Sequence, residues 1–478
     1  MAVPFPAAAD TANELPDIGN PASAVISKNQ EYQFGRMIMH QMDSSGVLIN
    51  DPEITDYIQH LGYRLAYHGN DSEQRFTFFV VDDPSINAFA LPGGFIGVHT
   101  GLIMASANEN ELAGVMAHEI AHVTQRHIAR SIQDSSETSM LTTAAMVAAL
   151  VIGGLSGAGS DAAVAALSAA QAAGIQRQIN FTRANEYEAD RIGIGILADA
   201  GFDPEGMGTF FETLQRRSGI VNRDLEFLRT HPVTQNRIAE ARNRAARLPP
   251  VKNASSRGYG VIRERVMVLN SDSPDEALAH YRNQNTGPLS EQSDHVQYGQ
   301  ALALMRQGKT SDAQGIFEAL LNRNETVVAY HIAAARAQLA AGDSEAGLKT
   351  FADALTLFPR NVPLTMRYAE ALIDEGEANK AHRMMLDLIN NVRYTTSQLR
   401  LLAMAASSAG DAGDAYYYNS EVHVLRGELA LAIRQLKQAL ESPDLNAVQR
   451  SRFQARLDFI IENLPKKERK RLAKAGEI

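Results

Sequence analysis

The sequence His118-Glu119-Ile120-Ala121-His122 lies inside an apolar, helix-forming run and decides the fold of the N-terminal half of the chain. Residues four positions apart share one face of an α-helix, so His118 and His122 can bind the same metal ion. Zinc lowers the pKa of a water molecule bound to it to about 7. Glu119 can face this water and take its proton. The motif therefore predicts a catalytic zinc site. A surface helix with two histidines is the alternative for the motif taken alone.

The third protein ligand has to come from another segment. His127 lies five residues after His122, roughly 140° further around a continuous helix, so it cannot easily reach the same ion. The downstream sequence Asn185-Glu186-Tyr187-Glu188-Ala189-Asp190 is a better candidate, because Glu186 and Asp190 share a helix face. Glu186 as ligand and Asp190 as acceptor for a ligand histidine would complete a His₂Glu site. Taken alone, the same segment could be an exposed acidic helix.

The composition limits the other kinds of chemistry. The 478 residues carry a formal net charge of −10 and no cysteine, so thiolate ligands and disulfides are excluded. Any transition-metal site must then use histidine and carboxylate groups. The basic cluster 466–471 is expected to be a solvated helix end, and we expect no nucleic-acid partner.

The N-terminal half is predicted to form helices around a small β-sheet. Apolar residues at helical spacing predict helices, and a β-branched and aromatic run predicts a buried strand. The predicted helices are 30–41, 53–66, 108–131 and further helices over 175–248, and the predicted strand is 76–81. Segment 87–99 contains Pro92-Gly93-Gly94, which suits an edge strand and turn better than a central strand.

Residues 139–174 are almost uncharged and rich in alanine and glycine. The apolar run Met140 to Leu155 is shorter than the roughly 20 residues that cross a bilayer. We favour a helical hairpin packed on the enzyme core. A membrane-touching surface over 140–174 and a lid hinged at Gly153-Gly154 are the alternatives.

The C-terminal half is repetitive, with glycines at 308, 342, 376 and 410, each 34 residues after the previous one. Small residues follow these glycines by five positions, and large apolar residues follow the first three by nine: Ala313, Gly347, Ala381 and Ala415, then Phe317, Phe351 and Met385. The period resembles the tetratricopeptide repeat, although its early tryptophan is missing and Asn419 breaks the fourth unit. Such stacks bind peptides or proteins in a concave groove. A non-repetitive helical bundle is the alternative.

HEIAH at 118–122 followed by NEYEAD at 185–190 resembles the HExxH…ExxxD signature of the M48 peptidase family. The segments AFALPGGFIGVHTGLI, HEIAHVTQRH, NEYEADRIG and THPVTQNRI, with the repeats, extend the resemblance over nearly the whole chain. The resemblance implies one zinc ion per chain, bound by His118, His122 and Glu186. It also implies Glu119 as general base, with Asp190 as proton donor or as support for a ligand.

The resemblance gives a further role to His231, which precedes a proline and is otherwise a helix-cap residue. It implies that His231 can take the position of the catalytic water and hold the enzyme latent until it is displaced. Arg237 is expected to form an ion pair nearby. Segment 87–99 resembles the edge strand along which the family's substrates lie extended.

The predicted fold class is mainly α: a zincin-like (gluzincin) metallopeptidase domain with a small β-sheet, followed by an α-solenoid of tetratricopeptide repeats. The predicted parts are a poorly ordered segment 1–25, the peptidase domain 26–250, a connector 251–275 and the repeat domain 276–478. Within the connector, Val261 to Leu269 is apolar enough to form an ordered helix instead.

For family members with this N-terminus and these repeats, the resemblance implies a periplasmic zinc endopeptidase that degrades misfolded or stalled outer-membrane proteins and assists their assembly. Its partners would be such unfolded or misassembled proteins and, through the repeats, the outer-membrane β-barrel assembly machinery. Residues 1–21 lack the basic and apolar regions of a signal peptide, so we expect the start of a mature exported protein with Met1 added for expression. The alternative is a chaperone or adaptor acting mainly through its repeats. A peptidase-like scaffold without metal is disfavoured because every ligand position is intact.

Overall fold

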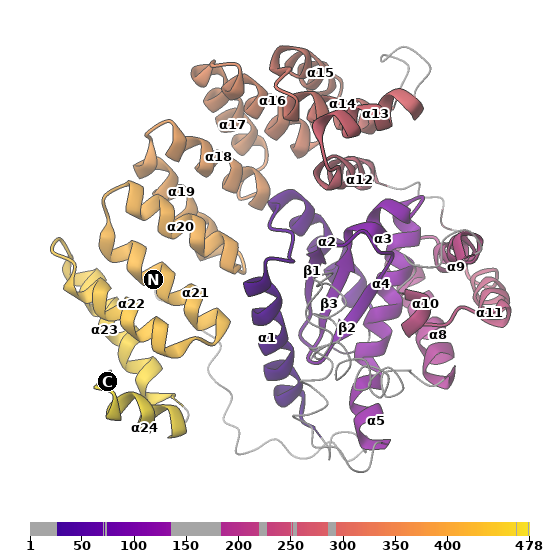
Figure 1. Cartoon of the computed structure of the whole chain (residues 1–478), viewed down its shortest axis with the longest axis horizontal. Helices are drawn as coiled ribbons and strands as arrows, with labels where there is room; N and C mark the ends of the chain where they lie inside the picture. The colour runs from indigo at the N-terminus through magenta and orange to yellow at the C-terminus, as the bar shows by residue number, and fades with distance from the viewer. Residues whose placement is uncertain are drawn as a thin grey trace, which may run out of the picture. The chain divides into compact units, whose positions relative to one another are not determined.

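The computed structural model describes residues 26–69, 71, 74–134, 183–218, 227–249, 251, 256–284, 293–464, 466–476 and 478. The predicted lead-in 1–25 and the apolar segment 139–174 lie outside the described residues. The described chain is mainly helical with one small sheet, which confirms the predicted fold class (Figure 1). It divides into two compact units, Pro6–Gly299 and Gln300–Ile478.

The first unit contains all the strands of the described chain. Its elements are α1 (Lys28–Ser45), α2 (Pro52–Ala66), β1 (Thr77–Val81), β2 (Ala88–Leu91), β3 (Phe95–His99), α3 (Thr100–Ala105), α4 (Glu109–Thr124), α5 (His127–Asp134), α8 (Arg183–Asp199), α9 (Glu205–Ser218), α10 (Phe227–Thr230), α11 (Gln235–Ala245), α12 (Arg257–Asn270), α13 (Pro274–Gln284) and the first part of α14 (Asp294–Arg306). Side-chain caps fix where the two central helices begin, since Asp51 caps α2 and Asn108 caps α4.

The sheet has the strand order β1-β3-β2, with β1 parallel and β2 antiparallel to β3. The prediction of a buried strand at 76–81 is confirmed by β1. The prediction for 87–99 is correct for β2, which lies at the edge, and wrong for β3, which is central. A glycine is tolerated in this central strand because the rings of Phe79 and Phe89 pack over Gly97, where a Cβ would lie 2.5–2.9 Å from them.

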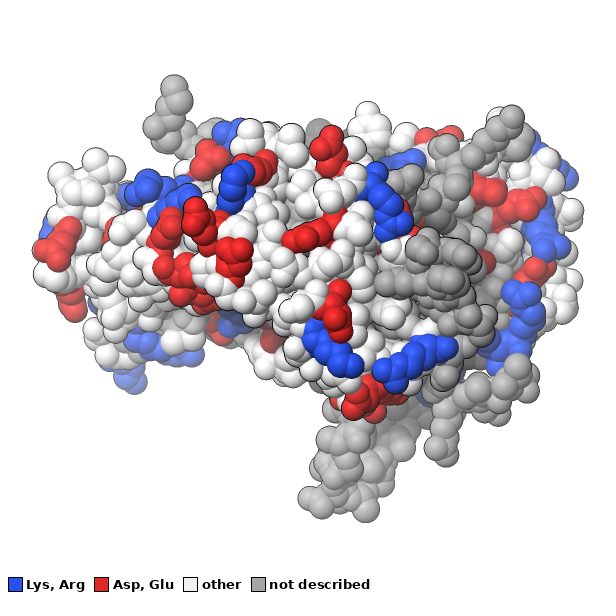
Figure 2. Space-filling model, turned by 90° about the horizontal axis from the view of Figure 1, so that it is seen from above, with Lys and Arg blue, Asp and Glu red and all other residues white. Residues whose placement is uncertain are grey.

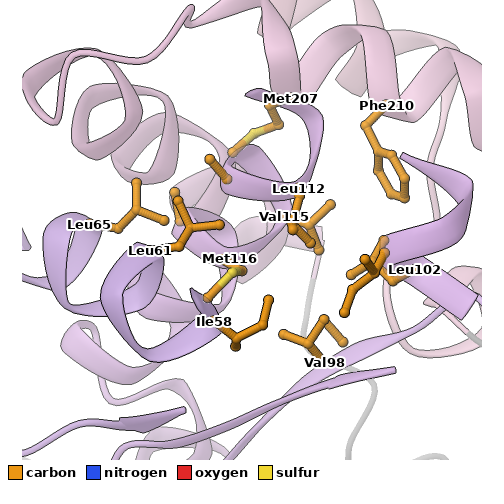
Figure 3. Packing of buried hydrophobic residues seen from close by; sticks show 14 of the residues in the cluster. Ile58, Leu61, Leu65, Val98, Leu102, Leu112, Val115, Met116, Met207 and Phe210 are labelled. Carbon is orange, nitrogen blue, oxygen red and sulfur yellow. The ribbon is translucent and has the colours of Figure 1, made fainter. Parts of the chain in front are cut away.

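Both faces of the sheet are covered by helices, so the strands are apolar on both sides. Alternate side chains of β1 enter different clusters. Phe78 and Val80 pack with α2 and α4, whereas Phe79 and Val81 pack with α1. Figure 3 shows the first cluster, to which α2 contributes Ile58, β3 Val98, α4 Met116 and α9 Met207. The labelled side chains also include Leu61, Leu65, Leu102, Leu112, Val115 and Phe210. This packing holds α4 firmly against the sheet.

The predicted single helix 108–131 is wrong, because the structure divides it into α4 and α5. Arg126 adopts φ 53, a left-handed conformation that a helix interior does not allow. Its buried guanidinium donates to the carbonyl of Ile26 at 2.6 Å and to Glu31 of α1 at 2.7 Å. This tertiary contact fixes a break that helical periodicity does not reveal, and the break turns His127 back towards α4.

Helix α12 packs against the peptidase core. Its residues Tyr259, Ile262 and Val266 belong to the same apolar cluster as α2 and α4. Arg265 of α12 is buried and pairs with Asp51 at 2.6 Å and with Glu53 at 2.9 Å. Helix α12, which lies within the segment predicted as a connector, therefore forms a layer of the first unit.

The second unit consists of helices that pack successively against one another: α15 (Thr310–Arg323), α16 (Val328–Ala340), α17 (Ser344–Leu357), α18 (Val362–Asp374), α19 (Ala378–Asn391), α20 (Thr396–Ser408), α21 (Ala412–Arg426), α22 (Leu429–Glu441), α23 (Ala447–Glu462) and α24 (Lys466–Lys474). The repeat glycines 308, 342, 376 and 410 all lie in turns with φ between 81 and 88. Phe317, Phe351 and Met385 are fully buried. The repeats are thus helix pairs of the tetratricopeptide type.

No helix in the described part of the chain combines the length and apolar character needed to cross a membrane. On the face shown in Figure 2, basic and acidic side chains form small groups that alternate with uncharged surface.

Candidate metal centre

Four buried side chains converge at one point between α4 and α8. His118 and His122 project from α4, Glu186 projects from the first turn of α8, and His231 follows α10. One potential ligand atom from each lies within 4.8 Å of all the others. The structure therefore brings together the three predicted ligands and the predicted regulatory histidine.

The distances between these atoms suit tetrahedral zinc. Zinc bonds of about 2.0–2.1 Å imply ligand atoms roughly 3.3 Å apart. His118 Nε2 lies 3.0 Å from His122 Nε2, 3.3 Å from His231 Nδ1 and 3.5 Å from Glu186 Oε2. Glu186 Oε1 lies 3.4 Å from His122 Nε2 and 3.0 Å from His231 Nδ1. The donor set and its spacing fit a zinc ion without rearrangement of the backbone.

Asp190 and Arg237 lie behind His118. Asp190 Oδ1 is 3.0 Å from His118 Nδ1, on the side of the ring that faces away from the ligand cluster. Both oxygens of Asp190 accept hydrogen bonds from Arg237 at 2.7 Å, and Arg237 also lies 2.8 Å from Glu186 Oε2. The expected ion pair of Arg237 is confirmed, and its single positive charge compensates part of the charge of two carboxylates that have almost no contact with solvent.

In the absence of metal, the charges of these groups depend on one another. Burial disfavours the protonated form of His118, but hydrogen bonds to Asp190 and Glu186 outweigh it and raise its pKa to about 9. Burial lowers the pKa of His122 well below its usual value. Burial also acts against ionisation of Glu186 and Asp190, yet the histidines around Glu186 and the Arg237 and His118 contacts of Asp190 hold both carboxyl pKa values low. The carboxylates of Glu186 and Asp190 are therefore charged, and Glu186 is ready to bind a cation.

Glu119 differs from the other carboxylates. Both its oxygens are buried, and neither has a hydrogen-bond partner of normal geometry among the described residues. Burial raises the pKa of this carboxyl, and the charges of His231 and His118 lower it only in part. The Nε2 atom of His231 lies 3.6 Å from Oε1 of Glu119. A buried carboxylate that no described side chain holds in a hydrogen bond, beside a metal-ligand cluster, is suited to accept a proton.

Among the described residues no strand pairs with the outer edge of β2, and this edge runs beside the cluster. The amide of His99 donates to the carbonyl of Asn87 at 3.0 Å. Since hydrogen-bonded pairs alternate in an antiparallel ladder, the backbone groups of Ala88 and Ala90 point away from β3 towards the open edge. The Ala90 amide also lowers the pKa of Glu119, with a smaller effect than burial and the nearby charges.

His127, which the sequence brought forward as a tempting ligand, lies outside the ligand cluster. Its Nδ1 is 2.8 Å from His122 Nδ1, and its Nε2 is 3.1 Å from Glu188. Burial lowers the pKa of His127. The contacts of His127 with His122 and Glu188 were not predicted from the sequence. The spacing of His122 and His127 was visible, but the chain break at Arg126 that brings the two rings together was not.

The fold and the site define a metallopeptidase of the HExxH type. A model described as "Peptidase family M48" matches residues 52–245. The chain is 34% identical to the "Beta-barrel assembly-enhancing protease" of Escherichia coli K12, over 95% of this chain and 92% of that protein. It is also 34% identical to the "Putative beta-barrel assembly-enhancing protease" of Vibrio cholerae, over 94% and 92%.

A third relative matches the peptidase part alone. The "Mitochondrial metalloendopeptidase OMA1" of Schizosaccharomyces pombe is 30% identical over 38% of this chain and 51% of that protein. The chain belongs to peptidase family M48, as its two sequence motifs predicted.

Proposed function

We propose that this chain is a zinc-dependent endopeptidase of the periplasm that degrades misfolded or stalled outer-membrane proteins and assists their assembly. The observation that carries the proposal is the buried His118, His122 and Glu186 cluster beside the buried carboxylate of Glu119. The substrate class and compartment are supported by the names of the two relatives that cover more than nine tenths of the chain, which tie them to β-barrel assembly.

In this proposal, each site residue has one task. His118, His122 and Glu186 would hold a zinc ion, which would supply a Lewis acid and lower the pKa of a water molecule. Glu119 would take a proton from the attacking water and return it to the leaving amine. We assign Asp190 to the orientation of His118 rather than to proton donation, because both its oxygens already accept hydrogen bonds from Arg237.

An extended substrate would pair with the free edge of β2. The outward backbone groups of Ala88 and Ala90 offer donors and acceptors at the spacing of a β-strand, and Ala90 is near Glu119. Main-chain pairing supplies affinity regardless of side chains, which suits an enzyme that meets many unfolded sequences.

His231 would hold the enzyme latent. Through Nδ1 it can provide a fourth ligand, while its Nε2 faces Glu119. A closed coordination position leaves no place for the catalytic water. The ring of Phe227 stacks on His231 at 4.8 Å, and the Phe227 amide donates to the carbonyl of Ile86, two residues before β2. A substrate that pairs along β2 would therefore disturb the segment that supports His231.

Cleavage of an unfolded outer-membrane β-barrel protein tests the proposal, with zinc content measured on the same samples. Glu119→Gln should keep one zinc per chain and lose about 100-fold or more in cleavage rate, because only the base is removed. His231→Ala should cleave faster than the wild type. His331→Ala, in the second unit, serves as a matched control with unchanged cleavage. Undiminished cleavage by the Glu119→Gln variant would refute the mechanism.

A chaperone or adaptor acting mainly through its repeats is the second candidate. The observation that favours it is the place of His231 within the ligand cluster, where it would keep the peptidase shut. In both candidates the repeats would bind the outer-membrane β-barrel assembly machinery. A zinc-loaded His231→Ala protein that degrades no unfolded polypeptide, but still promotes β-barrel assembly, would decide for the chaperone.

A further inference from the structure

We propose that His127 and Glu188 form a positioning pair that holds the imidazole of His122 in the tautomer able to bind metal. This inference rests on the proposed zinc site. It concerns two residues that lie outside the group of potential ligands.

The geometry places the pair directly behind His122. The two imidazole rings are nearly perpendicular, with centroids 4.8 Å apart and an interplanar angle of 77°. The atoms that face each other are both Nδ1, at 2.8 Å, and the His127 side chain is fully buried. His127 Nε2 continues the line to Glu188 Oε2 at 3.1 Å. Glu188 lies on α8, two residues after the ligand Glu186.

The positions of the protons follow from these contacts. The Nε2 atom of His122 faces the ligand cluster, so a metal-bound His122 must carry its proton on Nδ1. Two Nδ1–H groups cannot face each other at this distance, so His127 Nδ1 must be the acceptor. His127 is then neutral, with its proton on Nε2, and it donates that proton to Glu188. Arg130 donates to the same Glu188 oxygen at 2.9 Å.

Each ligand histidine thus has its own proton acceptor. His118 is supported by Asp190, a carboxylate with 2% exposure that is held by Arg237. His122 is supported by a neutral imidazole, and the carboxylate behind it is 29% exposed. The acceptor of His122 can fix orientation and tautomer only if Glu188 first fixes the tautomer of His127.

Zinc affinity, measured by competition with a fluorescent chelator, tests the pair independently of catalysis. His127→Ala should weaken zinc binding about 10- to 100-fold, the usual effect of removing a residue that supports a metal ligand. In His127→Asn the amide oxygen can take the place of Nδ1 and accept from His122, so most of the affinity should return. In His127→Gln the amide lies near the position of Nε2, so the loss should resemble that of His127→Ala.

Glu188 provides a test that does not disturb the core, because its side chain is partly exposed. Glu188→Ala should weaken zinc binding, whereas Glu188→Gln keeps an acceptor for His127 and should stay close to the wild type. His331→Ala is the control for removal of a buried histidine elsewhere. Wild-type affinity in His127→Ala, or a better rescue by Gln than by Asn, would overturn the inference. Failure of the wild-type protein to bind zinc would instead overturn the proposed function.

Discussion

Replacement of Arg237 by methionine would expose how strongly the site depends on charge compensation. Arg237 is 2% exposed and contacts Asp190 through two hydrogen bonds and Glu186 through a third short contact. Methionine keeps most of the apolar volume and removes the charge, so the variant leaves two buried carboxylates beside each other with fewer partners.

The expected cost is large for the metal-free protein. Removal of one partner from a buried ion pair costs about 3–5 kcal/mol, because the remaining charge stays buried without compensation. Burial has the largest effect on the pKa of Asp190 and raises it. The hydrogen bond with Arg237 has the next largest effect and lowers this pKa. Without Arg237 the Asp190 pKa should rise, and part of the cost should appear as proton uptake. Zinc brings positive charge to the same place, so it should restore part of the lost stability.

Urea unfolding of the wild type and Arg237→Met, with EDTA and then with zinc, measures this effect. Asp190→Asn and the double variant complete a double-mutant cycle, in which the double variant should lose less free energy of unfolding than the two single losses together. Equal stability of Arg237→Met and wild type in EDTA, or simple addition of the two losses, would refute the argument that Arg237 compensates these carboxylates.

Two further predictions concern the framework of the site. Gly114→Ala should destabilise the first unit by about 1–3 kcal/mol in thermal unfolding, because its Cβ would lie 2.9 Å from the Met207 backbone. Gly195→Ala, on a helix position with open space, is the matched control and should be neutral or slightly stabilising; a stabilised Gly114→Ala would contradict this packing. Burial opposes ionisation of Asp83, but hydrogen bonds with His99 and Ser85 lower its pKa from 3.8 to about 2. A lowered carboxyl pKa stabilises the fold above the unfolded value and loses that effect as the pH falls towards 2. Asp83→Asn should therefore be less stable than wild type at pH 6 and equal to it near pH 2 in urea unfolding of metal-free protein, and a pH-independent difference would contradict this assignment.

Local patterns predicted much of the fold. The helices around 30–41 and 53–66, the buried strand and the 34-residue repeats each depend on periodicity within a short segment, and the structure has them all. The predictions were wrong where residues distant in the sequence determine the place of a strand or the end of a helix. β3 is central because both β1 and β2 pair with it, and the helix after the motif breaks because Arg126 binds Ile26 and Glu31.

The site divides in the same way. His118 and His122 are four residues apart on one helix, and Glu186 was found from a second motif, so sequence reasoning could assemble them. Their supporting partners come from tertiary structure. The partnership of His127 with His122 requires the turn at Arg126, and the pairing of its other nitrogen with Glu188 requires α8 to pack against α4. No spacing in the sequence carries that information.

Diffraction from zinc-loaded crystals on both sides of the zinc absorption edge tests the central claim most directly. The account predicts one anomalous peak per chain, within about 2.0–2.2 Å of His118 Nε2, His122 Nε2 and a carboxylate oxygen of Glu186. A strong peak elsewhere, or an ordered site in which Glu186 stays outside bonding distance of the metal, would contradict it.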